Sequence, residues 1–264
     1  MVDVNVKYHK RDYRTPLHAA AYIGNKEVAL LLIKCGADVN LACGFGRMPL
    51  HYAALKGHKE VARILIECGA DPNVTENYIE RRTPLHTAAK WGYRQFIQIL
   101  IECGANPNVT DKQGRMPLHE TALEGHKEAS RLLIKCGAEL NAPDGKGKMP
   151  LHEAAGKDHR EVARLLIECG ADPNLASDDE DGRTPLHLAA WWGKREMAQL
   201  LIECGANPNV GDKCDSTPLH LAGERGYPQV VDILIKSGAR TNVADKWGIV
   251  PCHHHRITRN FMGI

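Results

Sequence analysis

One tripeptide, Pro-Leu-His, returns along this chain of 264 residues at a nearly constant interval. Its seven copies begin at Pro16, Pro49, Pro84, Pro117, Pro150, Pro185 and Pro218. The intervals are 33, 35, 33, 33, 35 and 33 residues, and a decayed copy follows 33 residues later at Pro251. A second string, ending in Cys-Gly-Ala or Ser-Gly-Ala, keeps the same spacing. Repetition with this period indicates copies of one small structural unit stacked in a row.

The first copy indicates what each unit contains. Thr15 is a favourable N-cap residue, and Pro16 suits the first helical position because it lacks an N–H group. Residues Leu17–Ile23 are therefore expected to form a short helix, which Gly24 ends in the left-handed conformation. In three later copies a methionine replaces the N-cap threonine, and we expect each replacement to cost about 1 kcal/mol. These methionines are Met48, Met116 and Met149.

A second helix is expected over Glu27–Cys35, with Val28, Leu31 and Leu32 at the spacing of a buried helix face. The stretch 38–47 is expected to project as a hairpin or loop that leads to the next unit. Neither helix can bury its apolar face alone, so the units must stack on one another.

The strings Thr-Pro-Leu-His at 15–18 and Ile-Glu-Cys-Gly-Ala at 66–70, repeated in step, resemble the ankyrin repeat family over nearly the whole chain. The resemblance implies an all-α fold, an ankyrin-repeat solenoid of stacked helix-turn-helix units with projecting β-hairpin or loop fingers. We interpret residues 1–264 as a single domain that begins with a partial unit (1–9) and ends in a degenerate cap (245–264). The seven repeats lie near 10–42, 43–77, 78–110, 111–143, 144–178, 179–211 and 212–244.

The first residues fit this repeat as well. Asp3-Val4-Asn5 matches the end of a repeat, as in Asp38-Val39-Asn40, although no helices precede it. A solenoid needs polar caps. We therefore expect either a chain cut from a larger protein or unconventional caps.

Composition excludes several classes of partner. Lysine and arginine together exceed aspartate and glutamate by only two, so no broad field for nucleic acid or membrane surfaces is expected. No apolar run approaches the roughly 20 residues of a membrane span. The N-terminus carries no apolar stretch of the kind found in secretory signals.

Six of the nine cysteines hold the same position in their repeats: Cys35, Cys68, Cys103, Cys136, Cys169 and Cys204. Packed helices lie roughly 8–10 Å apart, too far for neighbours in this column to form disulfides. We interpret these residues as small, buried and reduced. Reduced thiols favour an intracellular, cytoplasmic protein, or one inside a host cell if the source is a pathogen or symbiont.

The histidine of each Pro-Leu-His is structural in ankyrin proteins, where it forms hydrogen bonds at the junctions between hairpins and helices. A metal site at Cys252 and His253–His255 is not favoured, because consecutive helical residues point about 100° apart. The sequence carries no Gly-rich phosphate loop, no Gly-x-Ser-x-Gly and no His-Glu-x-x-His. We expect no catalytic residues, no cofactor and no metal.

In proteins of the family that this chain resembles, the partner binds the finger tips and the concave face of the first helices. Residues that vary between copies at these places are therefore the candidates for partner binding. They are Arg14, Tyr22, Phe45, Arg47, Lys56, Tyr78, Arg82, Lys90, Trp91, Arg115, Leu123, Glu124, Lys148, Lys157, Arg183, Trp191, Trp192, Arg225 and Trp247.

Two patterns in this set each have two interpretations. All four tryptophans belong to it, and they are either exposed anchors for a partner or padding between neighbouring helices. A basic residue precedes the Thr/Met-Pro pair in six of seven repeats. This basic row favours an acidic or extended partner, unless it is only a solvated column. Its members are Arg14, Arg47, Arg82, Arg115, Lys148 and Arg183.

We expect a monomeric, non-catalytic module or scaffold that binds a protein partner, with no small-molecule substrate and no membrane contact. A regulatory or targeting domain of a larger effector, channel or adaptor is the main alternative. A nucleic-acid binder along the basic row and an enzyme with a cryptic site are further alternatives. Asn40 resembles sites of asparaginyl hydroxylation in other ankyrin proteins.

Overall fold

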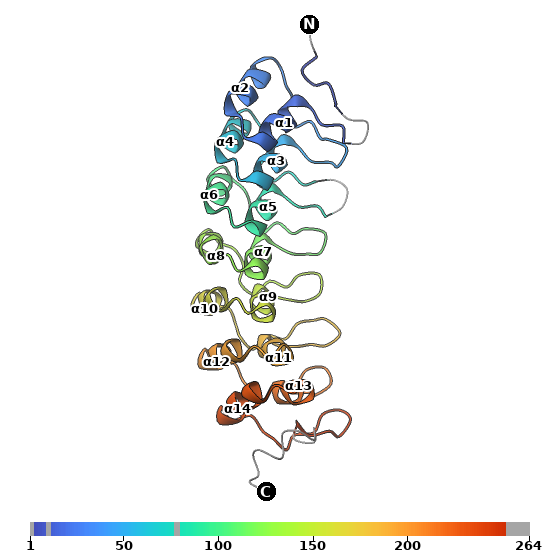
Figure 1. Cartoon of the computed structure of the whole chain (residues 1–264), viewed down its shortest axis with the longest axis vertical. Helices are drawn as coiled ribbons and strands as arrows, with labels where there is room; N and C mark the ends of the chain where they lie inside the picture. The colour runs from blue at the N-terminus through green and yellow to red at the C-terminus, as the bar shows by residue number, and fades with distance from the viewer. Residues whose placement is uncertain (1–2, 9–11, 77–79, 252–264) are drawn as a thin grey trace. The chain divides into compact units, whose positions relative to one another are not determined.

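The computed structural model describes residues 3–8, 12–76 and 80–251, and it is built from short helices joined by loops (Figure 1). Within those residues there are fourteen helices and no strand, so the predicted all-α fold is confirmed. The first helices of the repeats are α1 (Pro16–Ile23), α3 (Pro49–Lys56), α5 (Pro84–Lys90), α7 (Pro117–Glu124), α9 (Pro150–Lys157), α11 (Pro185–Trp191) and α13 (Pro218–Arg225). The second helices are α2 (Lys26–Lys34), α4 (Lys59–Glu67), α6 (Arg94–Glu102), α8 (Lys127–Lys135), α10 (Arg160–Glu168), α12 (Arg195–Glu203) and α14 (Pro228–Lys236).

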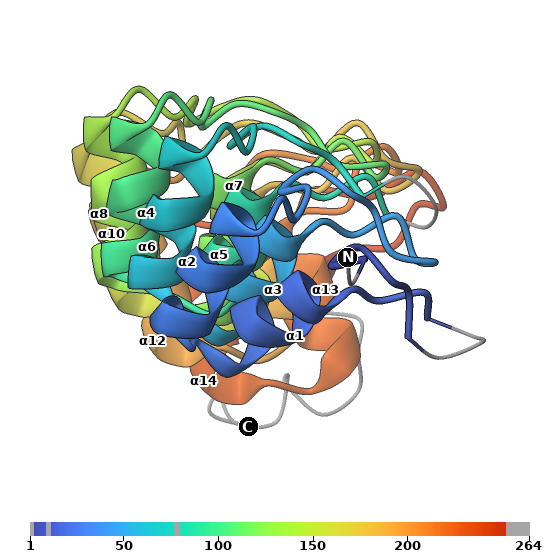
Figure 2. The ribbon, with the colours of Figure 1, turned by 90° about the horizontal axis from the view of Figure 1, so that it is seen from above.

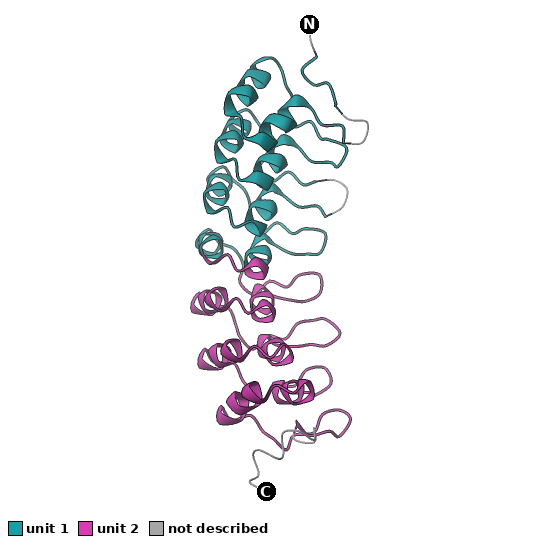
Figure 3. Ribbon diagram, viewed as in Figure 1, with its two compact units in different colours: residues 1–121, 128–139 teal, residues 122–127, 140–264 magenta. Residues whose placement is uncertain are grey.

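The helices form two compact units (Figure 3). Unit 1 covers residues 1–121 and 128–139, and unit 2 covers 122–127 and 140–264. In unit 1, α1 packs on α3 and α3 on α5, while α2 packs on α4 and α4 on α6. In unit 2, α9, α11 and α13 pack in the same order, as do α10, α12 and α14. Within each unit, first helices thus stack on first helices and second helices on second helices.

The fingers, which are the loops between a second helix and the next first helix, project beside the first helices (Figure 2). Each described finger turns without forming a strand. In one of them, the Asp111 amide donates to the Arg115 carbonyl at 2.9 Å. Among the described residues, the only extended pairing is a single antiparallel bridge between Tyr8 and Arg14. The fingers are therefore loops rather than regular hairpins.

The repeated histidine joins each first helix to the following finger. In the sixth repeat, the Thr184 amide donates to Nδ1 of His187 at 3.2 Å, and Nε2 of His187 lies 2.9 Å from the Ser216 carbonyl. Because Nδ1 accepts, the ring proton is on Nε2 and donates to that carbonyl. His18, His51, His86, His152 and His220 repeat the bond to the next finger. The structural role implied for these histidines is confirmed.

A second recurring contact, at the end of the repeat, uses asparagine. Asn73 Nδ2 donates to the Gly104 carbonyl at 3.0 Å, and its Oδ1 accepts from the Asn106 amide at 2.7 Å. Asn40 makes the matching bond to the Gly69 carbonyl. Asn5 also donates to the carbonyl of Gly36, so residues 3–5 occupy the position that ends a repeat elsewhere.

The second helix of the first repeat is less buried than its sequence predicts. Val28 and Leu31 are 42% and 61% exposed. Their counterparts in the sixth repeat, Met197 and Leu200, are 0% and 3% exposed. There the preceding second helix α10 packs on α12, whereas the described structure places no helix before α1 and α2. The prediction of a buried face was wrong for these two residues.

The prediction that the cysteine column is buried was also wrong. Cys35, Cys68 and Cys169 are exposed, and Cys103, Cys136 and Cys204 are partly exposed. Each directly follows the last residue of a second helix. The position therefore lies beyond the buried helix face. All eight cysteines that the structure describes are free thiols.

The methionine N-caps allow a direct test of capping. Thr184 Oγ1 lies 2.8 Å from Nδ1 of His187, whereas Met149 can make no such bond to His152. We expect Met149→Thr to raise the free energy of unfolding by about 1 kcal/mol. Urea unfolding followed by circular dichroism measures the change, and a value at or below that of the parent would contradict the capping argument.

Candidate functional site

The basic row lies where the fingers meet the first helices, but acidic side chains accompany it. Arg47 Nε donates to Glu76 Oε2 at 2.6 Å, and Glu76 itself is buried. Arg183 lies 3.2 Å from a carboxylate oxygen of Asp181. The row therefore does not present a continuous line of uncompensated positive charge within either unit.

The densest part of this pairing surrounds Glu120 in unit 1. Its Oε1 lies 3.3 Å from Arg82 and 3.1 Å from Arg115, and the residue is 1% exposed. Arg82 also contacts Glu80 at 2.7 Å, and Arg115 contacts the buried Asp111 at 3.2 Å. Burial raises the pKa of Glu120, while the two guanidinium groups oppose that rise. Sequence reasoning missed Glu120 because only the fold brings it between two arginines from different fingers.

Trp191 in unit 2 is held between two arginines. The Arg183 guanidinium lies 4.4 Å from the centroid of the indole ring, and that of Arg225 lies 3.4 Å from it. These distances are typical of cation–π stacking. Trp191 is only half-exposed, so this tryptophan fits the padding interpretation better than the anchor interpretation.

Three other tryptophans are exposed to solvent. Trp91 and Trp192 are 51% and 56% exposed and follow the last residues of α5 and α11, at the same repeat position. Trp247, in the finger after α14, is 65% exposed. Phe45, in the finger before α3, is exposed as well. These rings fit the anchor interpretation.

Trp91 stands at the edge of a small cavity in unit 1. The cavity has a volume of about 180 Å³ and lies between α3, α5 and the finger residues Glu76 and Arg82. The buried ring of Tyr52 and the side chain of Leu55 form its apolar part. Its charged lining residues include Arg47 and Glu76, which pair with each other.

The remaining candidates are also on fingers or at the ends of first helices. The Lys56 ammonium lies 4.8 Å from the centroid of the Tyr22 ring. Glu124 and Lys157 are exposed, and Lys90, Leu123 and Lys148 are half-exposed. Arg14 stacks over Tyr52 at 4.9 Å. Tyr78 lies outside the described residues.

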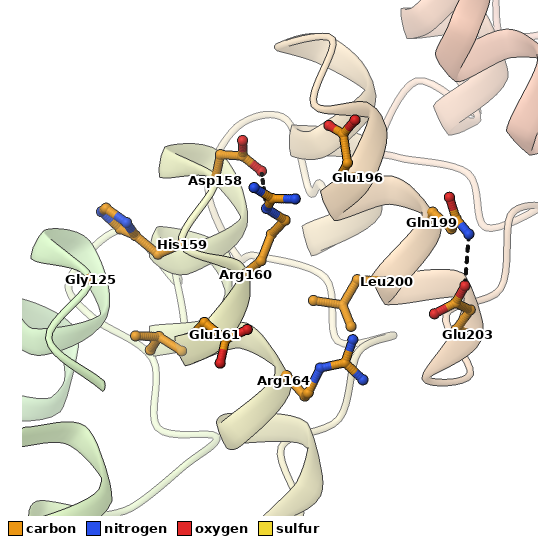
Figure 4. A pocket seen from close by; sticks show the side chains of 11 residues that line it. Gly125, Asp158, His159, Arg160, Glu161, Arg164, Glu196, Gln199, Leu200 and Glu203 are labelled. Carbon is orange, nitrogen blue, oxygen red and sulfur yellow. Dashed lines mark hydrogen bonds and ion pairs between the residues drawn. The ribbon is translucent and has the colours of Figure 1, made fainter. Parts of the chain in front are cut away.

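Another cavity of unit 2 lies on the side of the second helices. It has a volume of about 560 Å³ and lies between α10 and α12 (Figure 4). Charged side chains such as Arg160, Arg164 and Glu203 line it. Glu161, also at its edge, accepts from Lys127 at 2.6 Å, which lowers the pKa of Glu161. None of the predicted residues contributes to this open, polar groove.

Among the residues that the structure covers, no group of three histidine, cysteine or acidic side chains is placed to hold a metal ion. The doubtful metal ligands Cys252 and His253–His255 lie outside that part of the chain. No described helix has the length and apolar character needed to cross a membrane.

Within each unit, the stacked helix pairs define a repeat protein. The family model for ankyrin repeats (3 copies) matches residues 1–76, 45–111, 85–177, 141–212 and 175–245. The chain belongs to the ankyrin repeat family. Ankyrin repeats are generally protein–protein interaction modules and are typically not enzymes. A search of curated proteins found no match to this chain.

Proposed function

We propose that this chain is a non-catalytic module, a single ankyrin-repeat domain over 1–264, that binds a protein partner through its first helices and fingers. The observation that carries the proposal is the pair Trp91 and Trp192. Both are more than half exposed at the same repeat position, one in each unit. Tryptophan is enriched among the residues that dominate binding energy at protein interfaces.

The charges on this face favour a protein over a nucleic acid. Arginines that contact phosphates should be free to do so, but Arg47, Arg82 and Arg115 each contact carboxylates of this chain. Mixed charges with exposed aromatic rings are typical of protein interfaces. The row then serves to fix the fingers rather than to attract a polyanion.

The setting we propose is intracellular, with the chain acting alone as a monomer or as the regulatory or targeting part of a larger protein. The exposed thiols of Cys35, Cys68 and Cys169 support a reducing compartment. In an oxidising compartment such thiols would be open to modification and to intermolecular disulfides.

The proposal is tested by affinity capture from an extract of the source cell. We expect Trp91→Ala with Trp192→Ala to reduce the amount of captured partner by about tenfold or more, because large buried anchors dominate such interfaces. The matched control, Arg131→Ala with Arg164→Ala, changes one exposed residue of a second helix in each unit.

Circular dichroism should be the same for all three proteins. A partner that the tryptophan variant retains, or that the control variant loses, would contradict binding through the first-helix face. Nuclease treatment that abolishes capture would instead favour a nucleic-acid ligand.

A further inference from the structure

Gly156 in α9 occupies a position where every other first helix carries a side chain. The position lies six residues after the proline that begins each first helix. Its occupants in the other repeats are Tyr22, Leu55, Lys90, Leu123, Trp191 and Glu224. Neighbours on both sides in the repeat order are therefore large, and the fifth repeat alone has no side chain there.

The backbone does not require a glycine at this position. Gly156 lies within α9, and it is not among the residues with positive φ. A Cβ atom placed on it would meet nothing closer than Leu188 Cδ1, at 4.0 Å. A glycine inside a helix is less stable than alanine, since it loses more conformational freedom on folding. The fold would thus be more stable with a side chain here.

The missing side chain leaves a pit in unit 2. The pit has a volume of about 320 Å³, and Leu123, Leu188 and Trp192 provide its apolar lining. Leu188 is half-buried and the Trp192 ring is more than half exposed. This volume falls within the range of pockets that take small organic groups, about 300–1,000 Å³. A large side chain entering the pit would contact the leucines and cover part of the indole ring.

Positive charge lies at the rim of the pit. Lys148 and Lys157 both line it, with Glu153 as the acidic residue among the lining side chains. Lys157 is exposed, and within the described part of the chain it takes part in no ion pair. An ammonium group beside an apolar pit favours a ligand that carries a carboxylate next to its apolar group.

We propose that this pit, the Gly156 pit, receives one large apolar side chain of an extended segment of the protein partner, and that Lys157 binds a neighbouring carboxylate of that segment. The proposal rests on the proposed function and specifies the chemistry of the partner for unit 2. It also explains why a residue that weakens α9 is present: any larger side chain at this position would occupy the pit.

Selection of short random peptides displayed on phage, with the whole chain as bait, tests the proposal. We expect selected peptides to share one Leu, Met or Phe with an Asp or Glu nearby. Gly156→Leu, which places the residue of repeats two and four in the pit, should weaken their binding by about tenfold or more. Glu224→Leu is the matched control, because it places leucine at the same helix position in repeat seven. It should leave binding unchanged.

The thermal stability of the Gly156 variants shows whether a loss of binding comes from a filled pit or from a misfolded chain. Gly156→Ala and Gly156→Leu should both raise the thermal midpoint, by about 2 °C, because they remove a helical glycine. Lys157→Glu should weaken peptide binding, whereas Lys135→Glu, the same change at an exposed lysine of the second helix α8, should not.

If the selected peptides bind Gly156→Leu as tightly as the parent chain, the proposed role of the pit is overturned. The proposed protein-binding function would remain in place. A selection that yields no peptide above background would also overturn it. Loss of the natural partner in the tryptophan variant, but not in Gly156→Leu, would distinguish failure of the pit from failure of the proposed function.

Discussion

Acidification from neutral pH to about pH 5 should unfold this protein, through protonation of its column of repeated histidines. Burial lowers the pKa of His18, His51, His86, His152 and His187 from 6.5 to about 4. In each, Nδ1 accepts a backbone hydrogen bond, so a proton added there would break that bond and bury a charge.

The direction of this pH effect follows from the different pKa values of the histidines in the folded and the unfolded chain. The unfolded chain takes up these protons near pH 6.5, whereas the folded chain takes them up only near pH 4. The contribution to stability is therefore fully present above pH 6.5 and is lost as the pH falls toward 4. At about pH 5 each histidine costs roughly 2 kcal/mol, and five such costs are comparable to the total stability of a typical domain.

Urea unfolding at a series of pH values measures this loss. At about pH 5.5, the five histidines together should gain about four protons when the chain unfolds. His187→Asn, which cannot titrate, should reduce that uptake by about one proton. A free energy of unfolding that stays constant between neutral pH and about pH 5 would show that the histidines are not held neutral by the fold.

Glu120→Ala should cost about 3 kcal/mol of stability, the second large effect that we expect. The change leaves Arg82 and Arg115 without the buried carboxylate that both contact. Removal of one partner from a buried ion pair typically costs about 3–5 kcal/mol. The lower end applies here, because both guanidinium groups keep partial contact with water, which screens their charges.

Urea unfolding of the whole chain measures this change too. Glu196→Ala is a suitable control, since Glu196 is exposed and its contact with Arg195 is 3.6 Å at the surface. We expect the control to change stability by less than about 0.5 kcal/mol. Equal stabilities of the two variants would mean that the cluster around Glu120 contributes little.

The periodic features of the chain made the fold predictable. Proline at the first helical position and glycine after the last fix short helices, and the first helix predicted at 17–23 is observed at Pro16–Ile23. The second helix, predicted at Glu27–Cys35, is observed at Lys26–Lys34. Both results depend on local chain geometry, which sequence records directly.

Properties that depend on neighbouring repeats were harder to predict. Val28 and Val61 have the same residue type and repeat position, yet only Val61 is buried, because α2 packs on the helix α4 that carries it. Glu120 contacts Arg82, 38 residues earlier in the sequence, and Arg115, five residues earlier. No local sequence pattern predicts this pairing. The candidate surface was therefore located by family resemblance, while its charge pairing came only from the structure.

The central claim is that a protein partner sits on the first helices and fingers, and site-specific photo-crosslinking tests it most directly. A photoreactive amino acid replaces Lys56 or Glu124, exposed residues at the ends of first helices in units 1 and 2, or Arg131 or Arg164 on the second helices. After illumination in the source cell, we predict a protein crosslinked from positions 56 and 124 and none from 131 and 164. Crosslinking from the second helices alone would contradict the claim.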